Sequence, residues 1–285
     1  MDQWSGLRKN VGEWHGSFTQ CSPLGEVLGD IPSILRLEEG VDGKTMRLSL
    51  KRFPEGQPPR EIMQSFSYPG PGSNLLFFET GAFSQGAGQW FPSGQFGTEL
   101  GFVWGDRRLR LVQLFEGQPD GTSQLTSVTV IRETRAGCED EASSPLTVMD
   151  LCGHWRGNAV TISPTTTHPI NLSTDLVITV EGTQLSQKLS YRGETAAHVT
   201  ETVGRIEANC LWFEQSDSPV CVVLLPGGGS IAIPTKIKRD RSFFLEAGWL
   251  IAPHHRQRLI RRYNPQGQWL DLTLVEEFRE TFLAD

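Results

Sequence analysis

The sequence lacks the apolar runs and charge excess that mark several large classes of protein. Its longest uninterrupted apolar run covers residues 220–225, far short of the roughly 20 residues that a transmembrane helix needs. Its 26 basic residues are outnumbered by 33 acidic ones, for a net charge of −7, which argues against a general nucleic-acid binder. The N-terminus has neither the basic start nor the apolar core of a secretory signal. We therefore expect a cytoplasmic protein with no transmembrane segment and no nucleic-acid partner.

Signatures of metal binding and catalysis are also missing. The five cysteines are odd in number and contain no Cys-x-x-Cys pair, which suits free thiols better than a disulfide or zinc framework. No Gly-x-Ser-x-Gly motif marks a nucleophile, and the glycines at 227–229 lack the Lys-Ser/Thr of a phosphate loop. We expect no metal and no cofactor, and the sequence identifies no catalytic residue.

One motif, Gly-x-Trp-x-Gly, occurs twice, at residues 12–16 and 153–157. Further matches follow it in the same order, and both halves close on Thr-x-x-x-x-x-Arg-Glu, with the arginine at 132 and 279. Ordered matches of this kind predict a tandem repeat. We predict one domain over residues 1–136 and another over 145–285. The small, acidic segment 137–144 is predicted to link them.

Most of the remaining chain shows a period of two. Met46, Leu48 and Leu50 alternate with polar residues, and similar alternation recurs at 176–180 and 270–274. Clusters of Gly, Pro, Ser and Asn separate these segments, and no long amphipathic helix lies between them. The pattern predicts an all-β protein of two tandem antiparallel β-barrels, each preceded by a short helical turn.

The order of these features resembles the calycin superfamily, of which the lipocalins are members. The shared features are a short helical turn, Gly-x-Trp on the first strand, and an antiparallel run that ends in an arginine. The resemblance implies that the tryptophan plugs the closed end of each barrel and that the late arginine lies across its indole. Carried over by position, Trp14 pairs with Arg132, and Trp155 pairs with Arg279.

Over its whole length the chain more specifically resembles an uncharacterised family of cyanobacterial and plastid proteins with two calycin barrels. The segments that carry this resemblance are residues 10–18 and 261–273. S/T-type phycobilin lyases are similar in fold, although they are single barrels and their functional residues have no placed counterparts in this chain.

Two glutamates recur at matching places. Glu99 and Glu246 each lie two residues before a glycine on a predicted strand. If this face of the strand points inward, each carboxylate lies in a barrel near Arg110 or Arg258 and could anchor the polar end of a ligand. If the face points outward, each glutamate is a solvated surface residue. The rule that unpaired charge avoids the interior favours the solvated alternative.

The only dense basic stretch runs from residue 254 to residue 262. Adjacent histidines on a strand point to opposite faces, so His254 and His255 make a weak metal site. The stretch is open to two interpretations, an anion-binding strip or the solvated face of an edge strand. The second is favoured, because charged side chains protect sheet edges from pairing.

Small barrels of the implied type enclose an apolar cavity, which predicts a binding protein for an apolar small molecule such as a fatty acid, a pigment or a terpenoid-like compound. One alternative is an enzyme acting on such a ligand, as an isomerase, cyclase or chromophore lyase. Another is an assembly factor with filled barrels and a protein partner. The predicted ligand-binding residues come from the matched strands: Phe78, Glu99, Phe102, Trp104, Arg110, Phe213, Glu246, Trp249 and Arg258.

Overall fold

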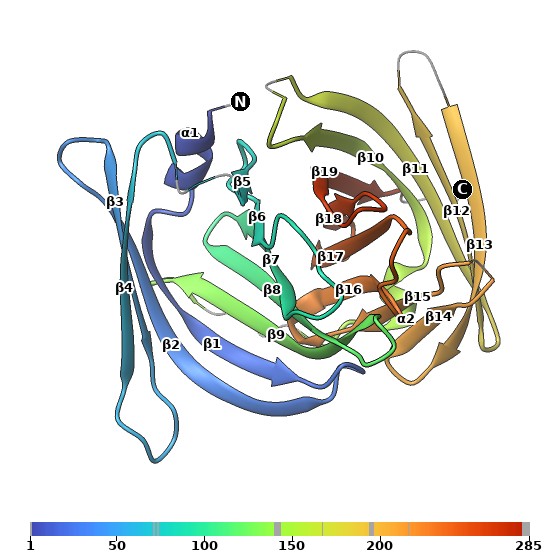
Figure 1. Ribbon diagram of the computed structural model, residues 1–285, viewed down its shortest axis with the longest axis horizontal. Helices are drawn as coiled ribbons and strands as arrows, with labels where there is room; N and C mark the ends of the chain where they lie inside the picture. The colour runs from blue at the N-terminus through green and yellow to red at the C-terminus, as the bar shows by residue number, and fades with distance from the viewer. Residues whose placement is uncertain are drawn as a thin grey trace, which may run out of the picture.

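The computed structural model describes residues 2–70, 72, 74–139, 144–166, 168–193, 197–215 and 217–280. Almost all of the regular structure in these residues is antiparallel β-sheet, so the all-β prediction is confirmed. The chain forms two barrel-like halves that lie side by side (Figure 1). None of the helices among the described residues is long and apolar enough to cross a membrane.

The N-terminal half is an open sheet of nine strands. Its order is β4-β3-β2-β1-β9-β8-β7-β6-β5, and the two edge strands, β4 and β5, do not pair with each other (Figure 1). The half consists of α1 (Gln3–Arg8), β1 (Gly12–Cys21), β2 (Val27–Glu39), β3 (Thr45–Arg52), β4 (Arg60–Ser67), β5 (Leu75–Phe77), β6 (Phe83–Gly86), β7 (Phe96–Trp104), β8 (Arg107–Gly117) and β9 (Ser123–Arg135).

The C-terminal half is a closed barrel of ten strands in sequence order. Its last strand pairs with its first, so the sheet has no free edge. The half consists of α2 (Val148–Leu151), β10 (Gly153–Ile162), β11 (Ile170–Glu181), β12 (Gln184–Arg192), β13 (Ala197–Glu207), β14 (Cys210–Phe213), β15 (Val220–Leu224), η1 (Pro226–Gly228), β16 (Gly229–Pro234), β17 (Phe243–Ala252), β18 (His255–Tyr263) and β19 (Trp269–Arg279).

The two halves differ by one strand, and the strand pairing shows which one. Gly101 on β7 pairs with Phe83 on β6, as Gly248 on β17 pairs with Ser230 on β16. β6 therefore corresponds to β16. The next strand in each sheet is β5 or β15, so these two strands also correspond. From the other side of the sheet, β4 corresponds to β13. Among the described residues, the N-terminal half therefore has no counterpart of β14, the strand that closes the second barrel.

The repeated glycine motif brings the first and last strands of each half together. A side chain at Gly16 would start 1.9 Å from the carbonyl oxygen of Arg132, and one at Gly157 would start 2.0 Å from that of Glu276. Any larger residue would push the two strands apart, so the second glycine of each motif is needed for this pairing.

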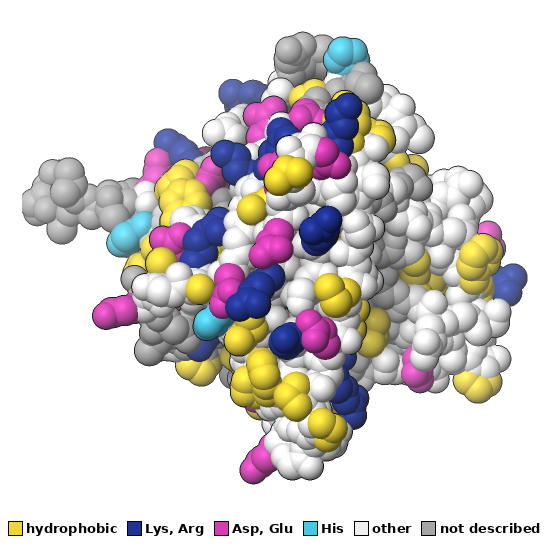
Figure 2. All heavy atoms as spheres, turned by 90° about the vertical axis from the view of Figure 1, so that its left-hand side faces the viewer, with side chains coloured by type: hydrophobic (Ala, Val, Ile, Leu, Met, Phe, Trp, Pro, Cys, Tyr) yellow, Lys and Arg dark blue, Asp and Glu magenta, His cyan; other side chains and the backbone are white. Residues whose placement is uncertain are grey.

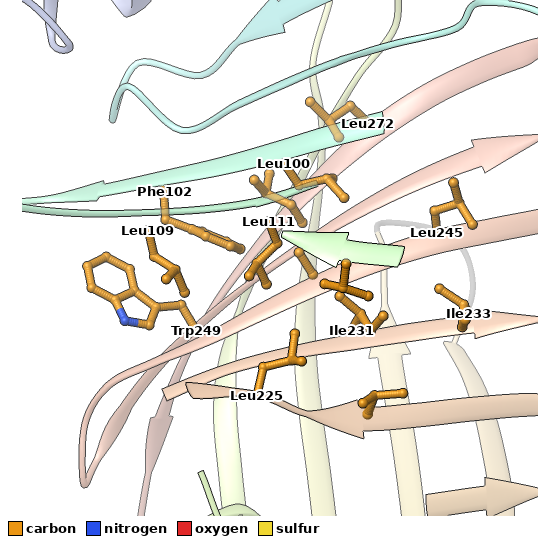
Figure 3. Packing of buried hydrophobic residues seen from close by; sticks show 14 of the residues in the cluster. Leu100, Phe102, Leu109, Leu111, Leu225, Ile231, Ile233, Leu245, Trp249 and Leu272 are labelled. Carbon is orange, nitrogen blue, oxygen red and sulfur yellow. The ribbon is translucent and has the colours of Figure 1, made fainter. Parts of the chain in front are cut away.

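The halves meet through the outer faces of their sheets. Figure 3 shows Leu100, Phe102, Leu109 and Leu111 from the N-terminal half packed toward Ile231, Ile233, Leu245 and Trp249 from the C-terminal half, in one hydrophobic cluster. Contacts across this junction run between β8 and β16, between β18 and β6, and between β7 and β17. Because β18 is paired on both sides within the closed barrel, the interpretation of the basic stretch as an edge strand is wrong.

Arg261 crosses the junction, where it is fully buried. Its guanidinium donates hydrogen bonds to Ser84 Oγ at 3.0 Å and to the carbonyl oxygens of Gly86 at 3.2 Å and Ala87 at 3.1 Å. The guanidinium carbon also lies 3.4 Å from the ring centroid of Trp269. The halves are thus held together by specific polar contacts as well as by apolar packing.

The predicted helical turns before each motif are present as α1 and α2. Asp2 caps α1, and Thr147 caps α2 in a reciprocal pair with Asp150. The domain limits at 136 and 145 stay predictions, and residues 140–143 of the predicted linker lie outside the described residues.

Candidate functional site

The motif tryptophan of the N-terminal half is enclosed by two arginines. Trp14 is fully buried, and its indole N–H donates to the carbonyl oxygen of Asn10 at 2.9 Å. The guanidinium carbons of Arg108 and Arg135 both lie 4.4 Å from its ring centroid. A cation over an indole face is stabilising by about 0.5–2 kcal/mol, so this group ties the first strand to the last two.

The predicted partner of Trp14, Arg132, is wrong. Trp14 pairs in register with Arg135, whereas Arg132 pairs with Ser17. Arg132 lies on the outer face of the sheet, where its Cδ approaches Gly227 of the other half. The Thr-x-x-x-x-x-Arg-Glu match therefore aligned the two last strands three residues out of register.

The C-terminal half repeats the arrangement around Trp155. The indole N–H donates to the carbonyl oxygen of Leu151 at 2.9 Å. The guanidinium carbons of Arg256 and Arg279 lie 4.7 and 4.6 Å from the ring centroid. Arg279 thus occupies the position that the resemblance implied.

A buried glutamate in the N-terminal half binds Arg108 together with a third arginine, Arg110. Glu133 accepts hydrogen bonds from Arg108 Nε at 2.7 Å and from Arg110 Nε and Nη2 at 2.9 and 3.0 Å. Arg110 Nη1 donates to Glu99 at 2.7 Å. Burial raises the pKa of Glu133, but the charges of the two arginines outweigh it and lower the pKa to about 2. Glu133 therefore stays ionised and holds both arginines.

The same group recurs in the C-terminal half. Glu277 accepts hydrogen bonds from Arg256 Nε at 3.0 Å and from Arg258 Nη2 at 2.9 Å, and Arg258 Nη1 donates to Glu246 at 3.2 Å. Burial raises the pKa of Glu277, and the two arginine charges again outweigh it and lower the pKa to about 2. The solvated interpretation of Glu99 and Glu246 is wrong, because both lie inside and are paired with arginine.

The interior of the N-terminal half contains a cavity of about 260 Å³. We call it the N-terminal cavity. β4 borders it on one side and β5 on the other, with no strand between them among the described residues. Ile62 on β4 lines the cavity and is 41% exposed, so the cavity is open to solvent on this side. Its wall is mainly apolar and its polar groups gather at one end: it is lined by Leu7, Asn10, Leu35, Leu37, Leu48, Leu50, Ile62, Gln64, Phe66, Leu75, Phe77, Phe83, Gln85, Glu99, Arg108 and Arg110.

The corresponding C-terminal cavity is much smaller, at about 70 Å³. Phe213 on β14, one of the predicted ligand-binding residues, lines it and packs against Gly204 on β13. Leu211, also on β14, contributes to the same wall. The extra strand thus both closes the second barrel and supplies side chains that fill it.

One polar atom at the N-terminal cavity has no partner. Arg108 is almost fully buried, and its Nη2 makes no hydrogen bond. Its Nη1 makes one long hydrogen bond, of 3.5 Å, to Asn10 Oδ1. A buried guanidinium N–H without an acceptor is costly. No nitrogen of the equivalent Arg256 is left buried and unpaired among the described residues. Arg108 thus lines the cavity and carries one donor, Nη2, that is buried and unpaired.

The other predicted aromatic residues do not line either cavity. Phe78, Phe102 and Trp249 belong to the junction between the halves. Trp104 is 42% exposed and lies edge-on to His255, with ring centroids 4.3 Å apart. The structure thus brings the charged candidates together inside each half and places most of the aromatic candidates on the opposite face.

The sequence interpretation missed Arg108 and Glu133. A signal for the first was present, because Arg-x-Arg recurs at 108–110 and 256–258 at the place where each half carries its interior arginines. A signal for Glu133 was present too, because Thr-x-x-x-Glu-x-Arg recurs at 129–135 and 273–279. The pairing of β8 with β9 is what brings Glu133 to the arginines. The described residues contain no group of three or more His, Cys, Asp or Glu side chains placed to hold a metal ion.

Comparisons with known proteins agree with this two-part organisation. Residues 1–138 match a family described as "Domain of unknown function (DUF3598), N-terminal", and residues 142–280 match "Biogenesis factor required for ATP synthase 1, C-terminal domain". None of the curated proteins searched matches the chain. The S-type phycobiliprotein lyase of Guillardia theta is 14% identical over 47% of this chain and 90% of its own, with a TM-score of 0.40.

A crystal structure from Nostoc punctiforme PCC 73102, described as a protein of unknown function from the DUF3598 family, is much more similar. It is 40% identical over 98% of this chain and 100% of its own, with a TM-score of 0.89. The predicted resemblance to an uncharacterised cyanobacterial family is confirmed by this match. The chain therefore belongs to the DUF3598 family.

Proposed function

We propose that the protein binds an elongated apolar small molecule in the N-terminal cavity, with the polar end of that molecule at Arg108. The observation that carries the proposal is the unpaired Arg108 Nη2 at the polar end of a cavity with a mainly apolar wall. Buried apolar area supplies affinity at about 25 cal/mol per Å² before the costs of association. A hydrogen bond from the guanidinium sets the orientation of the ligand.

The lateral opening suits a ligand longer than the cavity. Ile62 on β4 lines the cavity and is still 41% exposed, which is unusual for a large apolar side chain on an inward face. By contrast, Figure 2 shows basic and acidic side chains interspersed over the outer side of this half, as in the Lys51–Glu61 pair at 3.6 Å. Ile62 is therefore an apolar side chain of the cavity wall that solvent reaches.

The test is titration of the full-length protein with fatty acids, fatty esters, carotenoids and bilins, followed by quenching of tryptophan fluorescence. We expect at least one class to bind below about 100 μM, which corresponds to roughly 5–6 kcal/mol. Leu50→Trp fills the cavity and should weaken binding at least about tenfold. Leu189→Trp is the matched control, because Leu50 and Leu189 occupy the same register position in the two halves.

Loss of binding in Leu189→Trp but not in Leu50→Trp would place the ligand elsewhere. Absence of binding by every class would reject the proposal. The enzymatic alternatives, in which Glu99 or Glu246 moves protons, stay predictions.

A second candidate function is assistance in the assembly of a protein complex. It is favoured by the match of residues 142–280 to the C-terminal domain of a biogenesis factor required for ATP synthase. Deletion of the gene in its host should then lower the amount of assembled ATP synthase on native gels. An unchanged amount would remove this candidate.

A further inference from the structure

We infer that the N-terminal cavity selects a ligand whose polar end is an uncharged hydrogen-bond acceptor, such as the carbonyl group of an ester, amide or ketone, over one that ends in a carboxylate. This inference rests on the proposed function and narrows it to a class of ligand. It follows from the charges and the hydrogen-bond donors at the polar end of the cavity.

The charges at this end are already balanced. The charged side chains that line the cavity are Glu99, Arg108 and Arg110, and Glu133 lies directly behind the two arginines. Two positive and two negative charges sum to zero. Arg135, on the far side of Trp14, has its own partner in Asp106 at 3.2 Å.

The donors are almost all in use. Each nitrogen of Arg110 donates to a carboxylate, with Nε and Nη2 on Glu133 and Nη1 on Glu99. Arg108 Nε is bound to Glu133, which leaves Nη2 as the unpaired buried nitrogen of this cluster. One free donor can satisfy one carbonyl oxygen.

A carboxylate would meet a different environment from a carbonyl group. It would add a third negative charge near Glu133 and Glu99 without a cation left to neutralise it, and a buried unpaired charge is strongly disfavoured. A neutral carbonyl oxygen satisfies Arg108 Nη2 without adding charge. The site therefore discriminates by charge between two head groups that present the same acceptor atom.

Glu99 is the residue that sets this preference. Its side chain is 22% exposed, whereas that of Glu133 is fully buried. Replacing Glu99 by Gln removes one negative charge and leaves Arg110 in excess. An anionic head group then restores neutrality, so the variant should favour a carboxylate.

The experiment compares decanoate with methyl decanoate at pH 8, using isothermal titration calorimetry on the full-length protein. We expect the ester to bind about tenfold or more tightly than the acid, a difference of roughly 1.4 kcal/mol. Glu99→Gln should shift the ratio toward the acid by at least about tenfold. Glu246→Gln, the equivalent change in the closed barrel, should leave the ratio unchanged.

The outcomes separate the inference from the function on which it rests. Tighter binding of decanoate by the unaltered protein overturns the preference for a neutral head group and leaves the binding function standing. A ratio that Glu99→Gln does not change, or that Glu246→Gln changes equally, overturns the assignment of the head group to this end of the cavity. If neither probe binds, and no other apolar ligand does, the proposed function itself fails.

Discussion

The N-terminal and C-terminal halves carry the same interior group of charged residues in two different sheets. In each half two arginines enclose a tryptophan, and one of these two shares a buried glutamate with a third arginine. Among the described residues only the closed barrel has a strand at the place of β14, and its cavity is about 70 Å³ against about 260 Å³ in the open half. The charged group is therefore part of the core that both halves share. The half with the larger cavity is the one without a described counterpart of β14.

The strongest test of a shared core is to remove its central charge. Glu277→Gln leaves Arg256 and Arg258 buried with too little negative charge, and breaking a buried pair in this way costs about 3–5 kcal/mol of unfolding free energy. Glu133→Gln should cost a similar amount, because the side chains of Arg110 and Arg258 are both almost buried, at 9% and 13% exposed. Urea denaturation of both variants measures the two costs.

The control for this pair of variants is Glu201→Gln, which removes a surface ion pair with Lys188 of 2.7 Å. Its effect should be small, because solvent screens an exposed ion pair. If Glu277→Gln is no worse than this control, the buried glutamates are not central to the fold.

Acid should act through the same two glutamates. Their pKa of about 2 lies well below the ordinary value of 4.5. The stability that they contribute is therefore fully present above about pH 4.5 and is lost as the pH falls through about 2. We expect the urea midpoint to fall steadily over this window, by an amount equivalent to a few kcal/mol. In Glu133→Gln and Glu277→Gln the fall should be shallower, and an equal slope in all three proteins would contradict the assignment.

The smallest expected effect concerns the arginines over the tryptophans. Arg135→Met and Arg279→Met each remove one cation from an indole face and should each lower the unfolding free energy by about 0.5–2 kcal/mol. The two losses should be similar, because the distances to the ring centroids are 4.4 and 4.6 Å. Thermal melts measure both, with the exposed Arg156→Met as the control. A clearly smaller loss in Arg135→Met would show that the opening weakens the tryptophan site as well.

The fold was largely predictable from local patterns, but the opening was not. Alternation and the repeated glycine motif indicate strands and a repeat because both reflect contacts near in sequence. The segment Leu76–Glu79 resembles Leu211–Glu214 in sequence, and this match aligns β5 with β14. Strand pairing instead makes β15 the counterpart of β5, because β5 pairs with β6 as β15 pairs with β16. Strands of three or four residues carry too little pattern to reveal that one of them is missing.

The sequence identified charged residues of the site but not the apolar residues that line the cavity. Glu99 and Arg110 were identified from their recurrence, but periodicity could not decide which face pointed inward. The rule that unpaired charge avoids the interior misled here, because Arg110 comes from β8 and Glu133 from β9. Whether a charge is paired depends on strand register, which one strand taken alone does not show.

The junction has one more consequence, which concerns ancestry. β8 contacts β16 where β18 contacts β6, so each half presents the same face to the other, as the subunits of a twofold symmetric homodimer do. In a homodimer every mutation appears in both subunits, and the loss of a strand would open both barrels at once. Fusion into a single polypeptide removes that constraint. One half of the chain can then lose a strand while the other half keeps its closed barrel.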